Sequence, residues 1–194
     1  MKGRFLLEVC ILAGGLNSRM GRTKATLRLG RLSLLNRVRS TATEAGFSVR
    51  IIRHDLVPRC GPLGGVYTGL LTTPADGVLF LSCDMPFITP DLLDLLVNGF
   101  RRGARAVFVR TENTVGFPFV LARAAVDEVE KQLAASQFSL QALAKRLRAR
   151  TIPLPAIRSW ELFNINTPAD FARAREYRRK SARQNFRPVR PVEN

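Results

Sequence analysis

The chain has 194 residues, enough for one domain with a full hydrophobic core, and its 46% hydrophobic content argues against wholesale disorder. Its 31 Lys and Arg residues against 15 Asp and Glu residues give a formal net charge of +16. Such an excess favours anionic partners, including triphosphates, acidic cofactors, nucleic acid and anionic lipid, although a solvated basic surface would give the same composition.

The cysteine and histidine content excludes several kinds of site. The three cysteines, Cys10, Cys60 and Cys83, match no disulfide framework, and a single His does not complete a usual zinc site. We therefore expect reduced thiols and a cytoplasmic protein. No apolar run reaches the roughly 18 residues that a membrane span needs.

The first half of the chain alternates apolar segments with helical patterns. Residues 5–12 predict a buried strand that ends in a glycine turn, and residues 32–45 predict a helix that ends at Gly46. Between them we expect a polar loop to about Arg31. The segments that follow are a strand over 49–52, a loop over 58–65, a helix opening at 66–71 and a strand over 77–82.

The second half continues the alternation. Thr89 and Pro90 have the residue types of a helix start. Strands are expected over 106–109, 117–121, 151–154 and 163–165, and helices over 124–135 and 140–147, with a last helix capped by Thr167-Pro168. Strands alternating with helices predict an α/β fold with a mostly parallel sheet covered on both faces.

The C-terminal residues differ in composition from the rest. We expect the folded domain to span residues 1–176, followed by a basic, disordered tail over 177–194, because arginines dominate this segment and two prolines follow them. The tail could be a solvated helix end or an arm that binds polyanions.

Glycines and basic residues follow the first predicted strand. Gly14 and Gly15 allow backbone N–H groups to approach a phosphate, and Arg19 and Lys24 add positive charge. The segment has neither the P-loop pattern nor the dinucleotide-binding glycine spacing. Because it leaves the carboxyl end of a strand, where α/β sheets bind ligands, it predicts a phosphate-binding loop.

Three further segments carry candidate site residues. Asp84 directly follows the strand over 77–82, where an acid could hold a hard cation such as Mg²⁺ or simply cap a turn. Asp55 precedes a Gly-Pro-Leu-Gly-Gly loop that could bring backbone close to a ring or sugar. Asn164 and Asn166 lie on the same side of an extended segment and could face one ligand. His54 lacks an obvious partner, and Trp160 is expected to be structural.

In this order, the four segments LAGGLNSRMGRTK, DLVPRCGPLGGVYTGL, FLSCDMPFITPDLL and FNINTPADF resemble the molybdenum cofactor guanylyltransferases, a MobA-like nucleotidyltransferase family. The resemblance implies a Rossmann-like, three-layer α/β/α nucleotidyltransferase domain. It also implies Mg²⁺-dependent transfer of GMP from GTP to the terminal phosphate of molybdopterin, with release of pyrophosphate. A molybdoenzyme or cofactor chaperone could be a further partner, whereas nucleic acid is not expected.

The resemblance also implies residue roles. Arg19, Lys24 and Asp84 would be catalytic, with Asp84 as the metal ligand. The nucleotide and substrate contacts would come from Leu12, Ala13, Gly14, Gly15, Lys24, Asp55, Gly61, Pro62, Leu63, Asp84, Asn164 and Asn166.

Two departures from the family pattern bear on activity. Thr23 stands where members often have Asp before the lysine, and residues 45–54 provide only one strand where the family has a strand, a helix and a second strand. Alternatives are the cytidylyltransferase of the same pathway, a sugar-phosphate nucleotidyltransferase and a non-catalytic nucleotide-binding homologue. A module that binds nucleic acid or membrane would rest on the tail alone.

Overall fold

The computed structural model describes residues 5–14, 24–112 and 115–184, and within them six strands form one sheet in the order β4-β1-β5-β7-β6-β8. Strand β7 runs antiparallel to both neighbours, and the other three pairings are parallel. The predicted mostly parallel sheet is therefore confirmed. The strands are β1 (Leu7–Leu12), β4 (Val49–Ile52), β5 (Gly77–Ser82), β6 (Ala106–Arg110), β7 (Val115–Ala122) and β8 (Arg150–Pro153).

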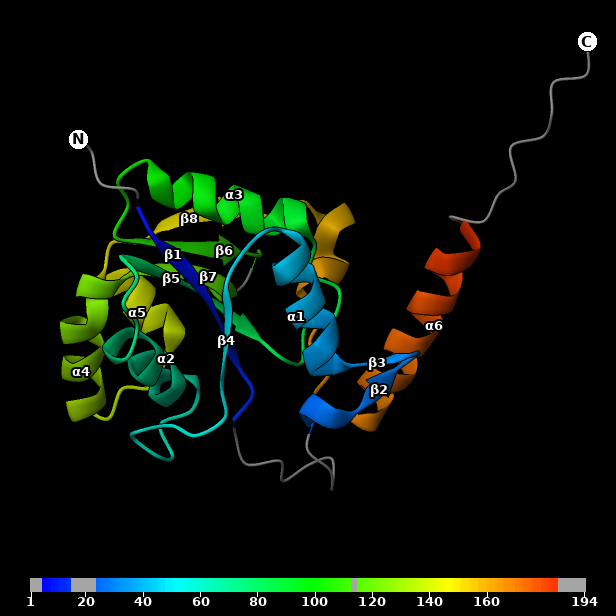
Figure 1. Cartoon of the computed structure of the whole chain (residues 1–194), viewed down its shortest axis with the longest axis horizontal. Coiled ribbons are helices and arrows are strands. Elements are labelled where there is room, and N and C mark those ends of the chain that lie inside the picture. The colour runs from blue at the N-terminus through cyan, green and yellow to red at the C-terminus, as the bar shows by residue number, and fades with distance from the viewer. Residues whose placement is uncertain (1–4, 15–23, 113–114, 185–194) are drawn as a thin grey trace, which may run out of the picture.

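Helices cover both faces of this sheet (Figure 1). Helices α1 (Leu34–Glu44) and α3 (Pro90–Arg101) lie on one face, and α2 (Pro62–Leu71), α4 (Val126–Ala134) and α5 (Leu140–Arg146) lie on the other. The side chains of strand β1 are buried on both faces of the sheet. Val9 and Ile11 pack toward α1 and α3, whereas Cys10 packs toward α2. Successive side chains of a strand point to opposite faces, so an apolar run buries both. The three-layer α/β/α architecture is confirmed.

A small unit lies beside the sheet. Helix η1 (Lys24–Thr26) leads into a hairpin of β2 (Arg28–Leu29) and β3 (Leu32–Ser33), which turns at Gly30 with φ +77°. The hairpin packs on the long helix α6 (Pro168–Gln184) through a core of its own. The expected polar loop to Arg31 was therefore wrong, because the buried Leu29 anchors a hairpin there.

Two other predicted boundaries were wrong. Helix α2 begins at Pro62 rather than within 66–71, because Pro62 stands at a first helical position where its missing N–H costs nothing. Residues 163–165 form no strand; they follow the 3₁₀ helix η3 (Ala156–Leu162), and Ile165 inserts into the small core instead of joining the sheet.

Helix α6 continues past residue 176, where we expected the domain to end, as far as Gln184. The ring of Tyr177 stacks on Trp160 at 4.0 Å between centroids and meets Phe87 edge-on at 4.9 Å. These contacts explain the helical start of the basic segment. Residues 185–194, the rest of the expected tail, lie outside the described residues.

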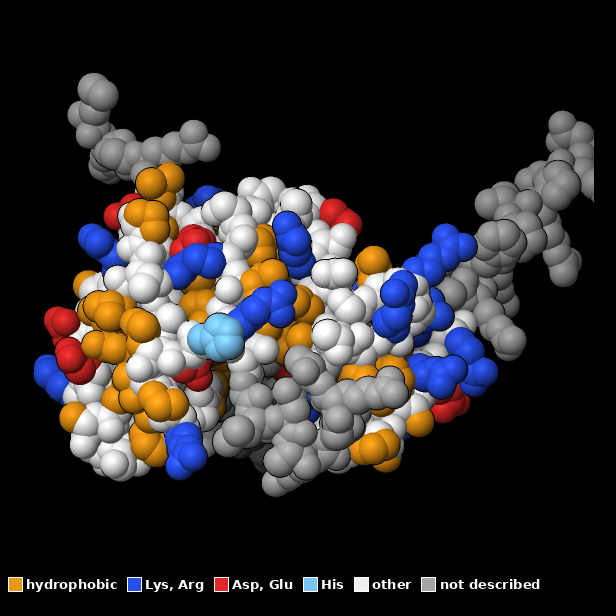
Figure 2. All heavy atoms as spheres, turned by 60° about the horizontal axis from the view of Figure 1, so that its bottom comes forward, with side chains coloured by type: hydrophobic (Ala, Val, Ile, Leu, Met, Phe, Trp, Pro, Cys, Tyr) orange, Lys and Arg blue, Asp and Glu red, His pale blue; other side chains and the backbone are white. Residues whose placement is uncertain are grey.

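The positive charge is distributed unevenly. Figure 2 shows Lys and Arg side chains crowding the end of the molecule formed by α6 and the hairpin, with fewer acidic side chains among them. In the described ranges, no helix is both long and apolar enough to cross a membrane.

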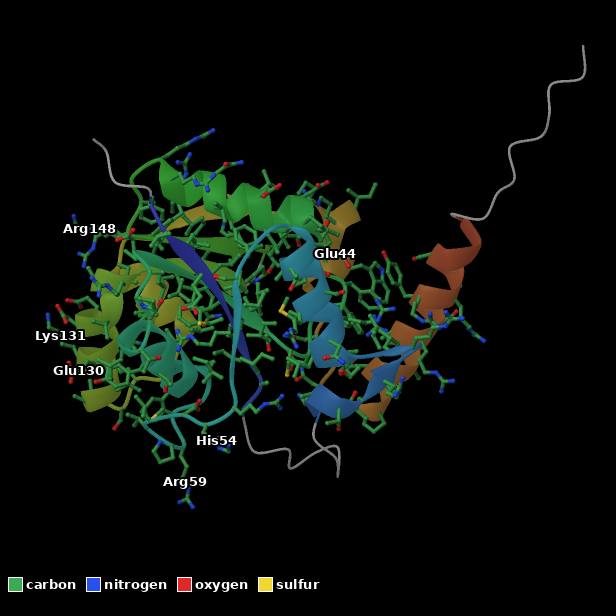
Figure 3. All side chains as sticks on the ribbon, viewed as in Figure 1. Glu44, His54, Arg59, Glu130, Lys131 and Arg148 are labelled. Carbon is green, nitrogen blue, oxygen red and sulfur yellow. The ribbon has the colours of Figure 1, made fainter. Side chains whose placement is uncertain are left out.

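The connection between α1 and α2 is short. Residues 45–61 contain a single strand, β4, which lies at the edge of the sheet beside β1. His54 and Arg59 project from the loop after β4, below the carboxyl end of β1 in Figure 3. The single strand that the sequence indicated before Asp55 is confirmed.

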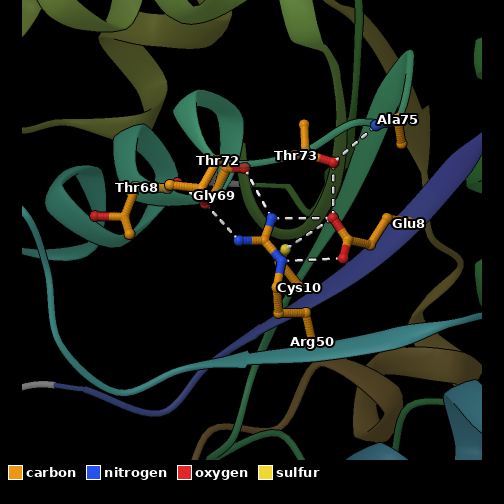
Figure 4. A network of polar contacts seen from close by, with 8 residues as sticks. All are labelled: Glu8, Cys10, Arg50, Thr68, Gly69, Thr72, Thr73 and Ala75. Carbon is orange, nitrogen blue, oxygen red and sulfur yellow. Dashed lines mark hydrogen bonds and ion pairs between the residues drawn. The ribbon is translucent and has the colours of Figure 1, made fainter.

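Glu8, an acidic residue inside the apolar first strand, is paired with Arg50 of β4 (Figure 4). Arg50 donates from Nε and Nη2 to the two carboxylate oxygens of Glu8, each at 2.9 Å, and Thr73 Oγ1 donates to Glu8 Oε2 at 2.7 Å. Arg50 also donates to the Gly69 carbonyl of α2 at 2.9 Å. This network fastens the edge strand to β1 and α2.

The thiol of Cys10 lies against this network, and burial raises its pKa from 9.0 to about 12. A thiol with a raised folded-state pKa contributes stability that is lost as the pH rises above the unfolded value of 9.0. The unfolding free energy of the wild type should fall between pH 7 and pH 10. In Cys10→Ala this fall should be smaller by about 1.4 kcal/mol, because the thiol is gone. Denaturant unfolding of both proteins at the two pH values measures this difference. Parallel pH profiles would contradict it.

Candidate active site

A cavity of about 870 Å³ opens at the carboxyl ends of β1, β4 and β5. Backbone hydrogen bonds hold these ends together: Ala13 N donates to Ile52 O at 2.8 Å, and Cys83 N donates to Leu12 O at 3.2 Å. Ala13 and Gly14 after β1 and Asp84 after β5 therefore line the same opening, as the parallel arrangement of β1 and β5 predicts.

Lys24, Asp84 and Asn166 form a polar cluster at this cavity. Lys24 Nζ lies 2.7 Å from Asn166 Oδ1 and 3.4 Å from Asp84 Oδ2. The other carboxylate oxygen of Asp84 accepts a hydrogen bond from Ser82 Oγ at 2.6 Å. The side chains of Lys24 and Asp84 are 23% and 16% exposed, so both remain accessible to a ligand.

The segment that carries Asn166 is tied to the loop after β5. Ile165 N donates to the Asp84 carbonyl at 3.0 Å, and the Ile165 side chain is fully buried. Asp170 Oδ2 accepts from the backbone N–H groups of Asn166 and Thr167, while Thr167 Oγ1 accepts from Asp170 N. This reciprocal cap starts α6 and holds Asn166 beside Lys24.

Asp55 also lines this cavity and lies close to glycines. A Cβ atom at Gly65 would lie 3.2 Å from Asp55 Oδ1, and one at Gly64 would lie 3.1 Å from Asp55 Oδ2. Burial raises the pKa of Asp55, and the nearby His54 partly offsets this rise. The Gly-Gly pair in the first turn of α2 thus allows the helix to approach the acid closely.

Gly64→Ala tests this close approach. A Cβ atom there would lie 2.5 Å from the carbonyl oxygen of Val57, which is backbone and has little room to move. We expect a loss of about 1–3 kcal/mol in unfolding free energy, together with displacement of the loop that carries Asp55. Thermal and denaturant unfolding measure the loss. Gly116→Ala is the control, since a Cβ atom there would meet no atom of the described residues within 4 Å. Equal effects of the two substitutions would refute the packing argument.

The rest of the cavity wall is largely basic or apolar. Arg53, His54 and Arg59 line it from the loop after β4, and Gly61 and Pro62 present the N-terminus of α2. Helix N-termini and basic side chains both favour anions. Leu12, Pro58 and Phe117 supply apolar surface. The cavity can therefore take a ligand that combines a flat apolar part with phosphates.

The structure brings most of the predicted site residues together. Leu12, Ala13, Gly14, Lys24, Asp55, Gly61, Pro62 and Asp84 line the cavity, and Asn166 contacts Lys24. Leu63 does not line it, because its side chain is fully buried in the core beneath α2. Asn164 is exposed and makes no side-chain hydrogen bond to any described residue. Arg19 and Gly15 lie outside the described residues.

Sequence reasoning missed several lining residues. His54 was discounted, yet it lines the cavity, and Arg53, Ser82 and Phe117 were not singled out. For Arg53 and Ser82 a signal existed, since each lies at the carboxyl end of a strand next to β1. Phe117 had none, because its strand pairs with β5 only in the folded sheet. Cys83 also lines the cavity, although it is only 7% exposed.

Solved structures of other proteins share this fold. A molybdopterin-guanine dinucleotide biosynthesis protein A from Archaeoglobus fulgidus superposes with a TM-score of 0.71 at 23% identity, covering 89% of this chain and 99% of its own. A nucleotidyl transferase from Methanothermobacter also gives 0.71, at 19% identity, covering 90% of this chain and 98% of its own. The fold is that of an α/β nucleotidyltransferase.

Sequence comparisons specify the family. The MobA-like NTP transferase domain matches residues 9–53 and 44–151, so both stretches include strand β4. A probable molybdenum cofactor guanylyltransferase from Opitutus terrae is 32% identical, covering 87% of this chain and 95% of the relative. A molybdenum cofactor guanylyltransferase from Syntrophotalea carbinolica is 30% identical, covering 85% of this chain and 89% of the relative. The chain belongs to the MobA-like NTP transferase family and is a nucleotidyltransferase.

Proposed function

We propose that the chain transfers GMP from GTP, in a Mg²⁺-dependent reaction, to the terminal phosphate of molybdopterin and releases pyrophosphate. The observation that carries this proposal is the cluster of Lys24, Asp84 and Asn166 at the cavity that Gly14 also lines. Two relatives named as molybdenum cofactor guanylyltransferases support the choice of nucleotide and acceptor.

Different regions of the cavity wall suit different parts of the proposed nucleotide. The apolar surface of Leu12, Pro58 and Phe117 suits the base, and the backbone of Ala13 and Gly14 would contact the base or ribose. Lys24 and the N-terminus of α2 suit the phosphates. We also keep Gly15 and Arg19 in the nucleotide site, as the resemblance implies.

The donor atoms around Asp84 fit a magnesium ion that arrives with the nucleotide. The described residues contain no group of three or more His, Cys, Asp or Glu side chains that could hold a metal by themselves. Magnesium is usually held by one or two carboxylates together with substrate phosphates and water, so the single carboxylate of Asp84 is sufficient. When bound, the ion would neutralise charge on the phosphate oxygens.

The chain's own residues account for the remaining requirements. A phosphate monoester is already largely ionised near neutral pH, so the acceptor needs no general base; the second pKa of a phosphate monoester is about 6. What the protein must supply is alignment and charge stabilisation at the α-phosphate. Lys24 is held by Asp84 and Asn166 in a position to donate hydrogen bonds to phosphate oxygens. A molybdoenzyme or cofactor chaperone would then receive the product.

Pyrophosphate release from GTP, CTP and ATP, each with and without molybdopterin, tests the proposal. We expect release with GTP, dependent on both molybdopterin and Mg²⁺. Preference for CTP would favour the cytidylyltransferase of the same pathway. Tight GTP binding without release under any condition would favour a non-catalytic homologue and refute the proposed reaction.

A further inference from the structure

A second, smaller hollow of about 270 Å³ lies beside the nucleotide cavity, between the β2–β3 hairpin, the start of α1 and the end of β4. Arg28 and Arg31 come from the hairpin, and Arg53 comes from the residue after β4. Three arginines, two from the hairpin and one from the residue after β4, thus line one concave surface.

The charges of this hollow are not compensated within the described residues. Its described lining contains no Asp or Glu, and none of the three arginines takes part in a salt bridge there. Arg28 Nη2 donates to the Arg31 carbonyl at 2.6 Å, which holds the hairpin turn in shape. Like charges gathered without a counter-charge attract an anion from solution.

The start of α1 adds neutral donors to the same hollow. Ser33 caps the helix by accepting a hydrogen bond from Asn36 N at 3.2 Å, so its hydroxyl proton remains available to a ligand. The Asn36 side chain is exposed and also lines the hollow. A phosphate group accepts hydrogen bonds from hydroxyl, amide and guanidinium donors together, and guanidinium–phosphate pairs are often bidentate.

The hollow adjoins the proposed reaction centre. Ala25 and Arg53 line both cavities, and Lys24 directly precedes Ala25. Burial raises the pKa of the Cys83 thiol, which lies beside Asp84, and the positive charge of Arg53 partly opposes this rise. An anion in the hollow would therefore share a wall with the nucleotide phosphates.

We propose that this hollow is a second phosphate-binding subsite, formed by Arg28, Arg31 and Arg53 with Ser33 and Asn36. It takes a phosphate-bearing anion other than the nucleotide: either the released pyrophosphate or the terminal phosphate of the acceptor. The link to the reaction rests on the proposed function, whereas anion binding by the hollow does not.

Arg31→Gln is the central variant, because Arg31 is exposed and lines the hollow but not the nucleotide cavity. Arg39→Gln is the matched control: Arg39 is an exposed arginine of α1 that lines neither cavity, so it removes the same net charge. Arg31→Lys restores the charge without the bidentate geometry.

Inorganic pyrophosphate is titrated calorimetrically into the GTP-saturated protein without acceptor. Because GTP fills the nucleotide cavity, the titration measures the affinity of the second subsite for pyrophosphate. We expect Arg31→Gln to weaken pyrophosphate binding roughly 10-fold or more, Arg31→Lys to fall between, and Arg39→Gln to stay within about 2-fold of wild type. Undetectable pyrophosphate binding by the wild type, or an Arg31→Gln variant that binds as tightly, would overturn the proposal.

Steady-state kinetics separates the two sources of the anion. A raised inhibition constant for pyrophosphate in Arg31→Gln identifies the leaving group, and a raised KM for molybdopterin identifies the acceptor; unchanged values of both would overturn a role in the reaction. A wild-type protein that fails to bind GTP would instead refute the proposed function. The pyrophosphate titration without nucleotide would then still test the hollow.

Discussion

Asp84→Asn is expected to lower the rate of pyrophosphate release from GTP by roughly two to four orders of magnitude while the protein stays folded. A metal that stabilises transition-state charge contributes several kcal/mol, and about 1.4 kcal/mol corresponds to each tenfold change in rate. Asn keeps an oxygen that can accept from Ser82 Oγ, as Asp84 Oδ1 does at 2.6 Å, so the local turn survives. What it removes is the negative charge that would hold Mg²⁺.

The measurement is initial rate against Mg²⁺ concentration, with thermal unfolding as the test of folding. Asp94→Asn is the control, since Asp94 is an exposed acid of α3 away from the cavity. We expect a raised Mg²⁺ requirement only in the Asp84 variant. A folded Asp84→Asn protein with near wild-type turnover would refute the metal assignment and most of the proposed chemistry.

Lys24→Ala should weaken GTP binding roughly 10- to 100-fold while affecting guanosine little. A charge-assisted hydrogen bond to phosphate contributes about 1.5–3 kcal/mol, and guanosine has no phosphate to receive it. The cost in folding stability should be small, about 1 kcal/mol or less, because the Lys24–Asp84 pair is partly exposed. The variant therefore separates ligand binding from folding.

Calorimetry with GTP and with guanosine measures the two affinities. Lys145→Ala, a change at an exposed lysine of α5, is the matched control. Equal losses for GTP and guanosine would place Lys24 away from the phosphates, and so would equal losses in the two variants.

Much of the cavity could be predicted from the sequence because its residues follow predictable strands. Asp84 comes directly after an apolar run, and parallel strands bring such residues to one edge of a sheet. Leu63 was assigned to the nucleotide site although it is buried, because the resemblance includes its motif without showing which side chain faces inward. The start of α2 at Pro62 determines that orientation.

Other features depend on contacts between distant parts of the chain. The hydrogen bond from Lys24 to Asn166 spans 142 residues, and it forms because Ile165 is buried and its N–H is bound to the loop after β5. The apolar pattern of residues 163–165 indicated extended backbone. Whether that segment joins the sheet or packs in the small core beside α6 depends on which side chains bury it.

The sequence by itself determined the α/β alternation, the position of Gly14 after β1, the acid after β5 and the single strand before Asp55, because each follows from local periodicity and composition. The tertiary structure alone decided that Arg53 lies between two cavities, that the segment around Arg28 and Arg31 is a hairpin, and that α6 packs against it. These arrangements follow from burial of side chains far apart in the chain, such as Leu29 and Ala174, and local patterns carry no information about such pairings.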